Sequence, residues 1–151
     1  MNYKTDCDQV RLVRERSQTL ERNKLNGSHL ARDYFRSIYE QNNDQINITE
    51  SFYVLACSND LTVLGWSKLS EGGLDSTVVD VRVLCKFAIE TLCTRVFICH
   101  NHPSGNLVPS ETDKRLTKKI KEALNMFDIS LVDHVIITEN DYFSFCDEGL
   151  I

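Results

Sequence analysis

The chain has 151 residues, of which 42% are hydrophobic and 26% are charged, and its formal net charge at pH 7 is −5. This size and balance are typical of one soluble globular domain, and the two prolines and six glycines exclude collagen-like and linker-dominated chains. The acidic excess argues against a protein whose whole surface is built to bind nucleic acid.

A polar extension precedes the first predicted element. Residues 1–27 carry six basic and four acidic residues, so we expect a basic, polar N-terminal extension followed by a folded domain over residues 28–151. A turn signal precedes Ser28, which is predicted to be the N-cap of a helix over residues 29–40. The helical period predicts one buried face for this helix. That face comprises Leu30, Tyr34, Phe35 and Ile38.

Two strands joined by a short turn should follow. Residues 51–57 are rich in aromatic and β-branched side chains, and residues 61–67 form a second strand after a turn at 58–60, which predicts a hairpin. Residues 79–91 return to helical spacing. Residues 96–99 are continuously apolar, which is typical of a strand buried in a sheet.

The last third of the chain contains one more helix and two strands. The helix is predicted over residues 110–127, and the strands over 132–138 and 142–146. Strands and helices therefore alternate in the middle and strands pair at both ends, which predicts an α/β sandwich with a mixed sheet. The buried stripe of the helix should contain Leu116, Ile120, Leu124 and Phe127.

The apolar segments and the cysteines indicate a cellular compartment. No apolar run is long enough to span a bilayer, and the polar N-terminus has no signal-peptide pattern, so we expect a cytoplasmic protein without a membrane partner. No cysteine pair has C-x-x-C spacing, which argues against a zinc ribbon or a thioredoxin-like redox site. We expect the cysteines to be reduced, and all but the first to be buried. They are Cys7, Cys57, Cys85, Cys93, Cys99 and Cys146.

The segment with the sequence CHNHPSGNLVPSETD carries the most chemistry. His100 and His102 stand two residues apart at the end of an apolar strand, so both imidazoles should face the same side and reach one metal ion. A loop with two prolines and a glycine then brings Asp113 to the first turn of the next helix, where its carboxylate can supply a third ligand. Two histidines and one carboxylate leave the fourth position of a Zn²⁺ site open, which is the pattern of a catalytic centre.

Ser110 and Asp113 also have a structural interpretation, because Ser-Glu-Thr-Asp matches the capping-box pattern at a helix start. The two interpretations are compatible. One oxygen of Asp113 could meet a backbone donor while the other binds metal. The Ser110 hydroxyl could accept a backbone hydrogen bond and keep its own proton for an oxyanion.

The spacing His100-x-His102, then seven residues, Ser110, two residues and Asp113 resembles the metalloprotease motif of the JAMM (JAB/MPN) family. More closely, the run HNHPSGNLVPSETDKRLTKKI followed by LVDHVIIT is similar to the RadC family of bacterial JAB-domain proteins, over about residues 50–147. The resemblance implies that residues 28–151 form a cytidine-deaminase-like, three-layer α/β domain with a mixed sheet flanked by helices.

The resemblance also implies a chemistry. In that family the histidine pair and the aspartate bind one zinc ion, which here would be His100, His102 and Asp113. Ser110 would support the transition state, and Glu50, which precedes an apolar strand, would be the general acid/base. The implied reaction is hydrolysis of a peptide or isopeptide bond in a peptide or protein substrate. Full-length RadC proteins carry an upstream helix-hairpin-helix-like segment that residues 1–27 are too short to form, so the chain resembles the stand-alone members.

Two other functions remain open. One is a DNA-associated accessory protein that binds weakly and without sequence preference through the N-terminal arginines and a basic helix face. The other is a metal-free binding module. The literal tripeptide His-Asn-His is not evidence for an HNH nuclease, and the deaminase signature is absent. The basic helix face would comprise Lys114, Arg115, Lys118, Lys119 and Lys121.

Several single residues have weaker signals. Asp133 and His134 could orient a ligand, bind substrate or form a hydrogen-bonded structural pair. His29 is expected at the surface. Glu71, in a predicted turn, and Glu90, facing solvent in a predicted helix, are poorer candidates than Glu50 for a positioned base.

Overall fold

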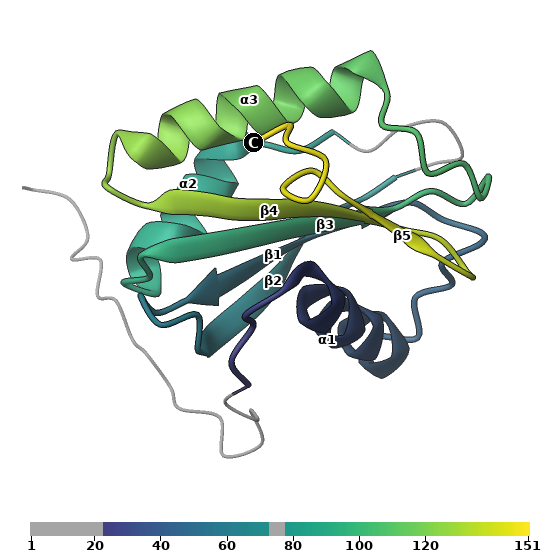
Figure 1. Ribbon diagram of the computed structural model, residues 1–151, viewed down its shortest axis with the longest axis horizontal. Coiled ribbons are helices and arrows are strands. Elements are labelled where there is room, and N and C mark those ends of the chain that lie inside the picture. Colours follow the sequence, from purple (N-terminus) through teal and green to yellow (C-terminus); the bar gives the residue numbers. More distant parts are fainter. Residues whose placement is uncertain (1–22, 73–77) are drawn as a thin grey trace, which may run out of the picture.

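A mixed sheet lies between two layers of helices (Figure 1). The structure, a computed structural model, describes residues 23–72 and 78–151. Within these ranges the order of helices and strands is the one that the sequence predicts. In chain order the elements are α1 (Ser28–Gln41), β1 (Ser51–Cys57), β2 (Val63–Glu71), α2 (Val81–Glu90), β3 (Arg95–Asn101), α3 (Glu111–Asn125), β4 (Ser130–Ile137) and β5 (Tyr142–Ser144).

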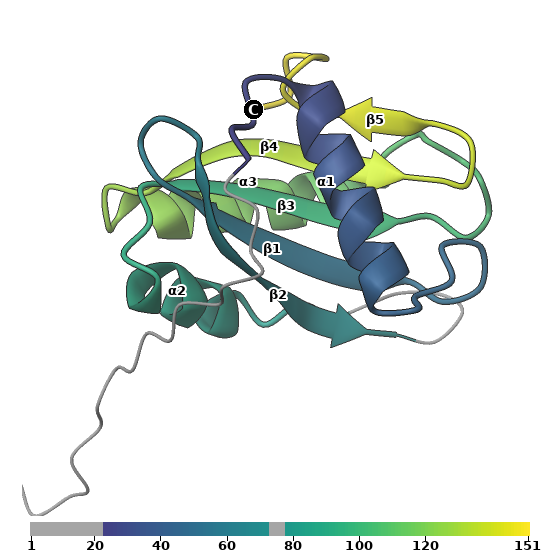
Figure 2. The same cartoon turned by 90° about the horizontal axis from the view of Figure 1, so that it is seen from below.

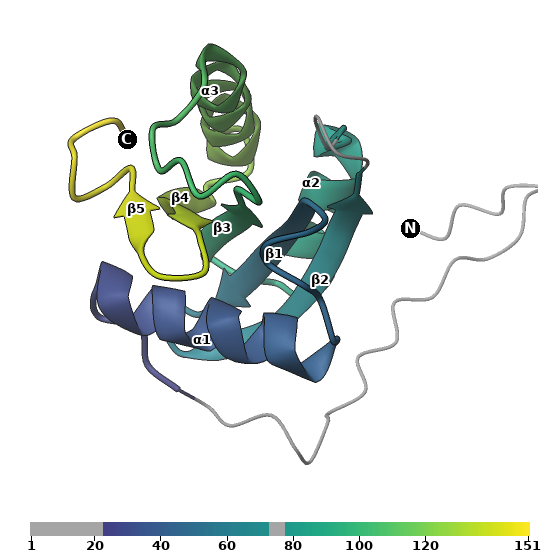
Figure 3. The same cartoon turned by 90° about the vertical axis from the view of Figure 1, so that its right-hand side faces the viewer.

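The sheet has the strand order β2-β1-β3-β4-β5. β3 and β4 run parallel, and the other neighbouring pairs are antiparallel, so β1 and β2 form the predicted hairpin. Figure 3 shows α2 and α3 on one face of the sheet and α1 on the other, and Figure 2 shows α1 crossing the opposite face. The predicted α/β class, the three layers and the mixed sheet are therefore confirmed.

Alternate side chains of the strands fill two separate cores. Tyr53 and Leu55 of β1 pack with Phe35 of α1, whereas Phe52 and Val54 belong to the core under α2 and α3. The position of a residue along a strand therefore decides which helical layer it faces. The core under α2 and α3 also contains Leu84, Ala88, Ile98, Ile120 and Leu124.

β3 is the middle strand of the sheet, and its residues 96–101 are buried. It lies between β1, in which Phe52 pairs with His100, and β4, in which Ile136 pairs with His100. The chain passes from β3 through α3 to the parallel strand β4. This crossover brings the start of α3 to the carboxyl end of β3, where ligand sites of α/β sheets commonly lie.

The first helix differs from its prediction at its start and on its buried face. Gly27 is the N-cap, and Ser28 is the first helical residue, so the prediction that Ser28 caps the helix is wrong. The Ser28 hydroxyl instead donates to Asp147 near the C-terminus. The side chain of Leu30 is 37% exposed rather than buried. The buried residues of α1 are Ala31, Phe35, Ile38 and Tyr39.

The other two helices are shorter than predicted. α3 ends at Asn125, so Phe127 lies beyond the helix and is 51% exposed, contrary to the predicted stripe. Leu116 is only half-buried, and Thr117 is buried beside Ile120 and Leu124. The predicted burial also fails at Cys146, which is exposed, and Cys85 is half-buried. The buried cysteines among the described residues are Cys57, Cys93 and Cys99, and all five that the structure describes are free thiols.

The described chain begins with residues that already contact the sheet. Lys24 forms an isolated β-bridge with Thr62, and the side chain of Leu25 is buried. Cys7 and the basic residues predicted in the extension lie outside the described residues, except Lys24. In the described parts of the chain, none of the helices combines the length and the apolar character needed to cross a membrane.

Candidate metal centre

Three of the predicted site residues meet at the carboxyl end of β3. Nε2 of His100 lies 2.9 Å from Nε2 of His102 and 3.2 Å from Oδ1 of Asp113. Nε2 of His102 lies 3.5 Å from Oδ2 of Asp113. These three residues form the one group of potential metal ligands found within residues 23–72 and 78–151. The structure therefore brings together the ligand set that the spacing predicts, while its binding of a metal stays a prediction.

The loop between β3 and α3 holds this geometry. The backbone N–H of His102 donates to Ile137 of β4 at 2.9 Å, so the pairing continues one residue beyond β3. A turn follows in which Gly105 donates to the carbonyl of His102, and the positive φ of Gly105, 78°, favours glycine at this position. The turn directs the chain back towards α3, whose first turn contains Asp113.

The hydrogen bond of His102 to the loop fixes which of its nitrogens is available. Nδ1 of His102 lies 2.5 Å from the carbonyl oxygen of Asn106. A carbonyl oxygen only accepts, so Nδ1 carries the proton and Nε2 of the neutral ring presents a lone pair to Asp113. A lone pair and a carboxylate at this distance repel unless a cation or a proton lies between them. The chemistry of the donor set therefore fits a bound divalent metal.

The pKa values of His102 and Asp113 shift in opposite directions, and both shifts favour a positive charge between the ring and the carboxylate. Burial alone would lower the pKa of His102, but the hydrogen bonds that the protonated ring makes with Asp113 and Asn106, and the charges of Asp113 and Glu50, raise it above the ordinary value. Burial alone would raise the pKa of Asp113, but its contacts with His100, His102 and Ser110 hold it well below the usual range. The carboxylate thus stays ionised and attracts positive charge to this point.

Ser110 and Asp113 form the predicted capping box. The Ser110 hydroxyl accepts from the Asp113 N–H at 3.1 Å, and the Ser110 N–H donates to Oδ2 of Asp113 at 2.7 Å. The same hydroxyl donates to Oδ2 at 2.7 Å, so its proton is not free, contrary to the expectation from sequence. The cap therefore orients the carboxylate. The hydroxyl, which is exposed, would have to rotate to reach an oxyanion.

Glu50 precedes β1 and lies beside the centre. Because Phe52 pairs with His100 across β1 and β3, the residues before Phe52 lie level with those after His100. The Glu50 charge helps to raise the pKa of His102, which places its carboxylate within electrostatic reach of that ring. Its backbone carbonyl accepts a hydrogen bond from Gly72 at 3.0 Å. The structure therefore brings Glu50 to the same edge as the histidines, while its role as acid/base stays a prediction.

The two competing glutamates are differently placed. Glu71 is the last residue of β2 rather than part of a turn, so that expectation is wrong, and it forms an ion pair with Lys68 at 2.8 Å. Glu90 is the last residue of α2 and lies 3.2 Å from Lys86. Both carboxylates have a structural partner of opposite charge.

Asn101 was not singled out by the sequence, although it joins the segments around the centre. Its Oδ1 accepts from the Ser51 N–H at 2.8 Å and lies 3.0 Å from the Tyr39 hydroxyl oxygen. Its Nδ2 donates to the carbonyls of Ile46 at 2.7 Å and Thr49 at 2.9 Å. This buried amide therefore ties the loop that leads to Glu50 to the end of β3. Asn101 stands between the two histidines at the end of β3, so the sequence offers no separate signal that would have identified it.

Asp133 and His134 have separate environments. Oδ2 of Asp133 accepts from the Ser144 hydroxyl at 2.6 Å and Oδ1 from the Cys146 N–H at 2.9 Å, and burial raises the pKa of Asp133. His134 is fully buried, with Nε2 2.8 Å from Nδ1 of His100. Burial and the neighbouring His100 hold the pKa of His134 well below its ordinary value. The aspartate therefore fastens the C-terminal segment, and the histidine contacts a candidate ligand.

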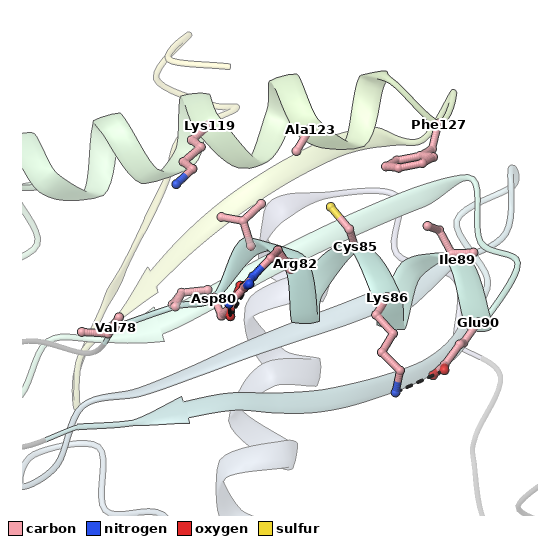
Figure 4. Close-up of a pocket in the computed structure, with 12 residues that line it drawn as sticks. Val78, Asp80, Arg82, Cys85, Lys86, Ile89, Glu90, Lys119, Ala123 and Phe127 are labelled. Atoms are coloured by element: carbon pink, nitrogen blue, oxygen red, sulfur yellow. Dashed lines mark hydrogen bonds and ion pairs between the residues drawn. The ribbon is translucent and has the colours of Figure 1, made fainter. Parts of the chain in front are cut away.

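Two surface features lie apart from the centre. A groove of about 980 Å³ between α2 and α3 is lined by Cys85, Ala123 and Phe127 together with the paired charges of Lys86 and Glu90 (Figure 4). On the basic face of α3, Lys114 pairs with Glu111 and Lys118 with Glu122. Two of the five basic side chains on that face are therefore paired with an acidic residue of the same helix. His29 is exposed at the start of α1, as expected.

Comparison with known proteins finds one family over most of the chain. The family model of the RadC-like JAB domain matches residues 25–150. A UPF0758 protein of Flavobacterium johnsoniae is 48% identical over 101 residues, which cover 67% of this chain and 44% of that protein. A UPF0758 protein of Fusobacterium nucleatum is 41% identical over 102 residues, covering 68% and 44%, and one of Shewanella woodyi is 35% identical over 136 residues, covering 89% and 58%. The matched part thus spans less than two thirds of each relative.

Proposed function

The chain belongs to the RadC-like JAB domain family, and from this premise we propose that it is a zinc-dependent hydrolase that cleaves a peptide or isopeptide bond with an activated water. The observation that carries the proposal is the meeting of His100, His102 and Asp113 at distances of 2.9–3.5 Å. Two imidazoles and one carboxylate are a typical ligand set of catalytic zinc, with one position left for water.

The neighbouring residues support a hydrolytic assignment of roles. A zinc ion bound here would polarise the substrate carbonyl and lower the pKa of a water molecule. Glu50 would take a proton from the water molecule while the water oxygen adds to the carbonyl carbon. It would then pass that proton to the leaving amine as the C–N bond breaks. Ser110, once rotated away from Asp113, would donate to the oxyanion, which the N-terminus of α3 would also stabilise.

The free thiols of the described cysteines support the expectation of a reducing compartment. A peptide or protein substrate follows from the proposed reaction.

Metal analysis tests the proposal directly. Protein purified without chelator is expected to contain about one zinc ion per chain. His100→Ala/His102→Ala should contain none, while His29→Ala, which removes an exposed histidine, should keep the metal. Equal zinc contents in the wild type and in the double variant would overturn the assignment. A peptide-library screen with the loaded protein then tests whether cleavage accompanies the metal.

A further inference from the structure

A chain of hydrogen bonds runs behind the candidate metal centre. The Thr117 hydroxyl lies 2.6 Å from the backbone carbonyl oxygen of Asp113 and 2.6 Å from Nδ1 of His134. Nε2 of His134 lies 2.8 Å from Nδ1 of His100. The chain therefore starts at the backbone of one candidate ligand, Asp113, and ends at the ring of another, His100.

The direction of donation along this chain is determined from its start. The carbonyl of Asp113 can only accept, so Thr117 gives it the one hydroxyl proton. Nδ1 of His134 must then be the donor to Thr117. His134 is fully buried, and its ring stacks on Phe145 at a centroid distance of 4.6 Å, an environment that favours the neutral ring. A neutral ring that donates from Nδ1 accepts at Nε2.

The last step reaches the candidate ligand. Because Nε2 of His134 accepts, Nδ1 of His100 must carry a proton and donate it. The lone pair of neutral His100 then lies on Nε2, the atom that faces His102 and Asp113. A metal binds the lone pair of a neutral imidazole, so the required tautomer is set by the protein itself.

We propose that His134, held by Thr117, is a positioning residue that fixes His100 in the tautomer and ring orientation needed to bind a metal. The proposal rests on the proposed function for the identity of the metal, but the tautomer is a property of the metal-free chain. His134 is 0% exposed, so a direct contact with substrate is not its role. Phe52 stacks on His100 with ring planes 8° apart and so limits tilting of the His100 ring out of its plane.

The test uses two variants that keep the shape of the buried site. Thr117→Val removes the hydroxyl at nearly constant volume, and His134→Phe replaces one flat ring by another between existing aromatic side chains. Two controls restore the hydrogen bonds: Thr117→Ser keeps the hydroxyl, and His134→Gln offers one acceptor and one donor. Melting temperatures identify any variant that fails to fold. If Thr117→Val or His134→Phe does not fold, the other of the two is used for the test.

Two readouts separate positioning from folding. In the metal-free wild type, ¹⁵N NMR of the imidazoles should show His100 protonated at Nδ1, and Thr117→Val and His134→Phe should show protonation at Nε2 as well. Competition with a chromophoric chelator should give a zinc Kd that is about 10–100-fold weaker in these variants, with at least partial recovery in Thr117→Ser and His134→Gln.

The outcomes distinguish this inference from the proposed function. A wild type that binds no zinc refutes the proposed function, and the NMR measurement then still decides the positioning role. Protonation of His100 at Nε2 in the metal-free wild type overturns the inference, and so does an unchanged zinc Kd in both folded variants.

Discussion

Glu50 is the residue on which the proposed chemistry depends most. A single substitution distinguishes a role as general acid/base from a role as metal ligand. Glu50→Gln keeps the size of the side chain but removes the proton acceptor. Zinc content and melting temperature should stay near those of the wild type, while hydrolysis should fall by about 10²–10⁴-fold. The measurement compares zinc content, melting temperature and turnover of Glu50→Gln on a peptide from the library screen.

Glu71→Gln and Glu90→Gln are the matched controls, because both glutamates form ion pairs with lysines, Glu71 with Lys68 and Glu90 with Lys86. Turnover close to normal in Glu50→Gln, with a large loss in either control, would show that the acid/base is elsewhere.

Asp133 predicts a pH dependence of stability. Burial raises the pKa of its carboxyl group in the folded chain above the unfolded value of about 3.9. Its contribution to stability is therefore complete below the unfolded pKa and is lost as the pH rises through the folded pKa. Asp133→Asn cannot titrate, so the wild type should be more stable relative to this variant at about pH 4 than at about pH 8.

Urea unfolding at both pH values measures this difference. Asp128→Asn, at an exposed turn position with φ 57° that asparagine also adopts, is the matched control for the loss of one charge. A difference between wild type and Asp133→Asn that does not change with pH, or that changes in the opposite direction, contradicts the prediction.

For single residues, the sequence predicts the candidate metal ligands but not the hydrogen bonds that hold them in place. His100, His102 and Asp113 are visible because strand alternation and a short loop connect them within one segment. The partners of Asn101 and His134 come from other elements, and only the strand register brings those elements together. No local pattern reveals such contacts.

Among the elements, α3 shows how a helix start can serve both folding and the site. Ser110→Ala removes the hydroxyl that accepts from the Asp113 N–H and donates to Oδ2 of Asp113. The free energy of unfolding should fall by about 0.5–2 kcal/mol, as is usual for the loss of an N-cap, and zinc should bind more weakly because the carboxylate is less well oriented. Chemical denaturation and chelator competition measure the two effects.

Ser110→Thr supplies the control, since threonine also caps helices and keeps the hydroxyl. If Ser110→Ala matched the wild type in both stability and zinc affinity, the cap would have no part in orienting Asp113.

The order of the elements is predictable because their hydrophobic periods are strong, whereas the buried faces of the helices are not. Tyr39 is buried and its hydroxyl donates to the Ser51 carbonyl, whereas the predicted core residue Leu30 is 37% exposed. Thr117 is buried in α3 because its hydroxyl bonds to Asp113 and His134. Periodicity ranks residues by hydrophobicity and cannot anticipate a polar group that finds its partner inside the fold.

For the whole molecule, charge argues for weak contact with DNA. The net charge is −5, and two lysines of α3 are paired with glutamates on the same helix. We expect non-specific binding with a Kd of about 10⁻⁶–10⁻⁴ M that weakens steeply between low and physiological salt. Fluorescence anisotropy with two duplexes of unrelated sequence measures affinity and preference together.

Lys119→Glu, which reverses a charge on the basic face of α3, should weaken any such binding on both duplexes equally. A sub-nanomolar complex with one duplex at physiological salt would be incompatible with this expectation.

The separation of the site along the chain has a consequence for how the protein folds. His100, His102 and Asp113 come from one strand–loop–helix segment, but Ser51 and Asn101 are 50 residues apart and His100 and His134 are 34 apart. Contacts between distant segments form late, because the entropy of closing the intervening loops opposes them. We therefore expect His100, His102 and Asp113 to come together before β1 and β4 pair with β3. Glu50 and His134 then reach the candidate ligands only in the finished sheet, so the proposed hydrolytic activity would be acquired in the last steps of folding.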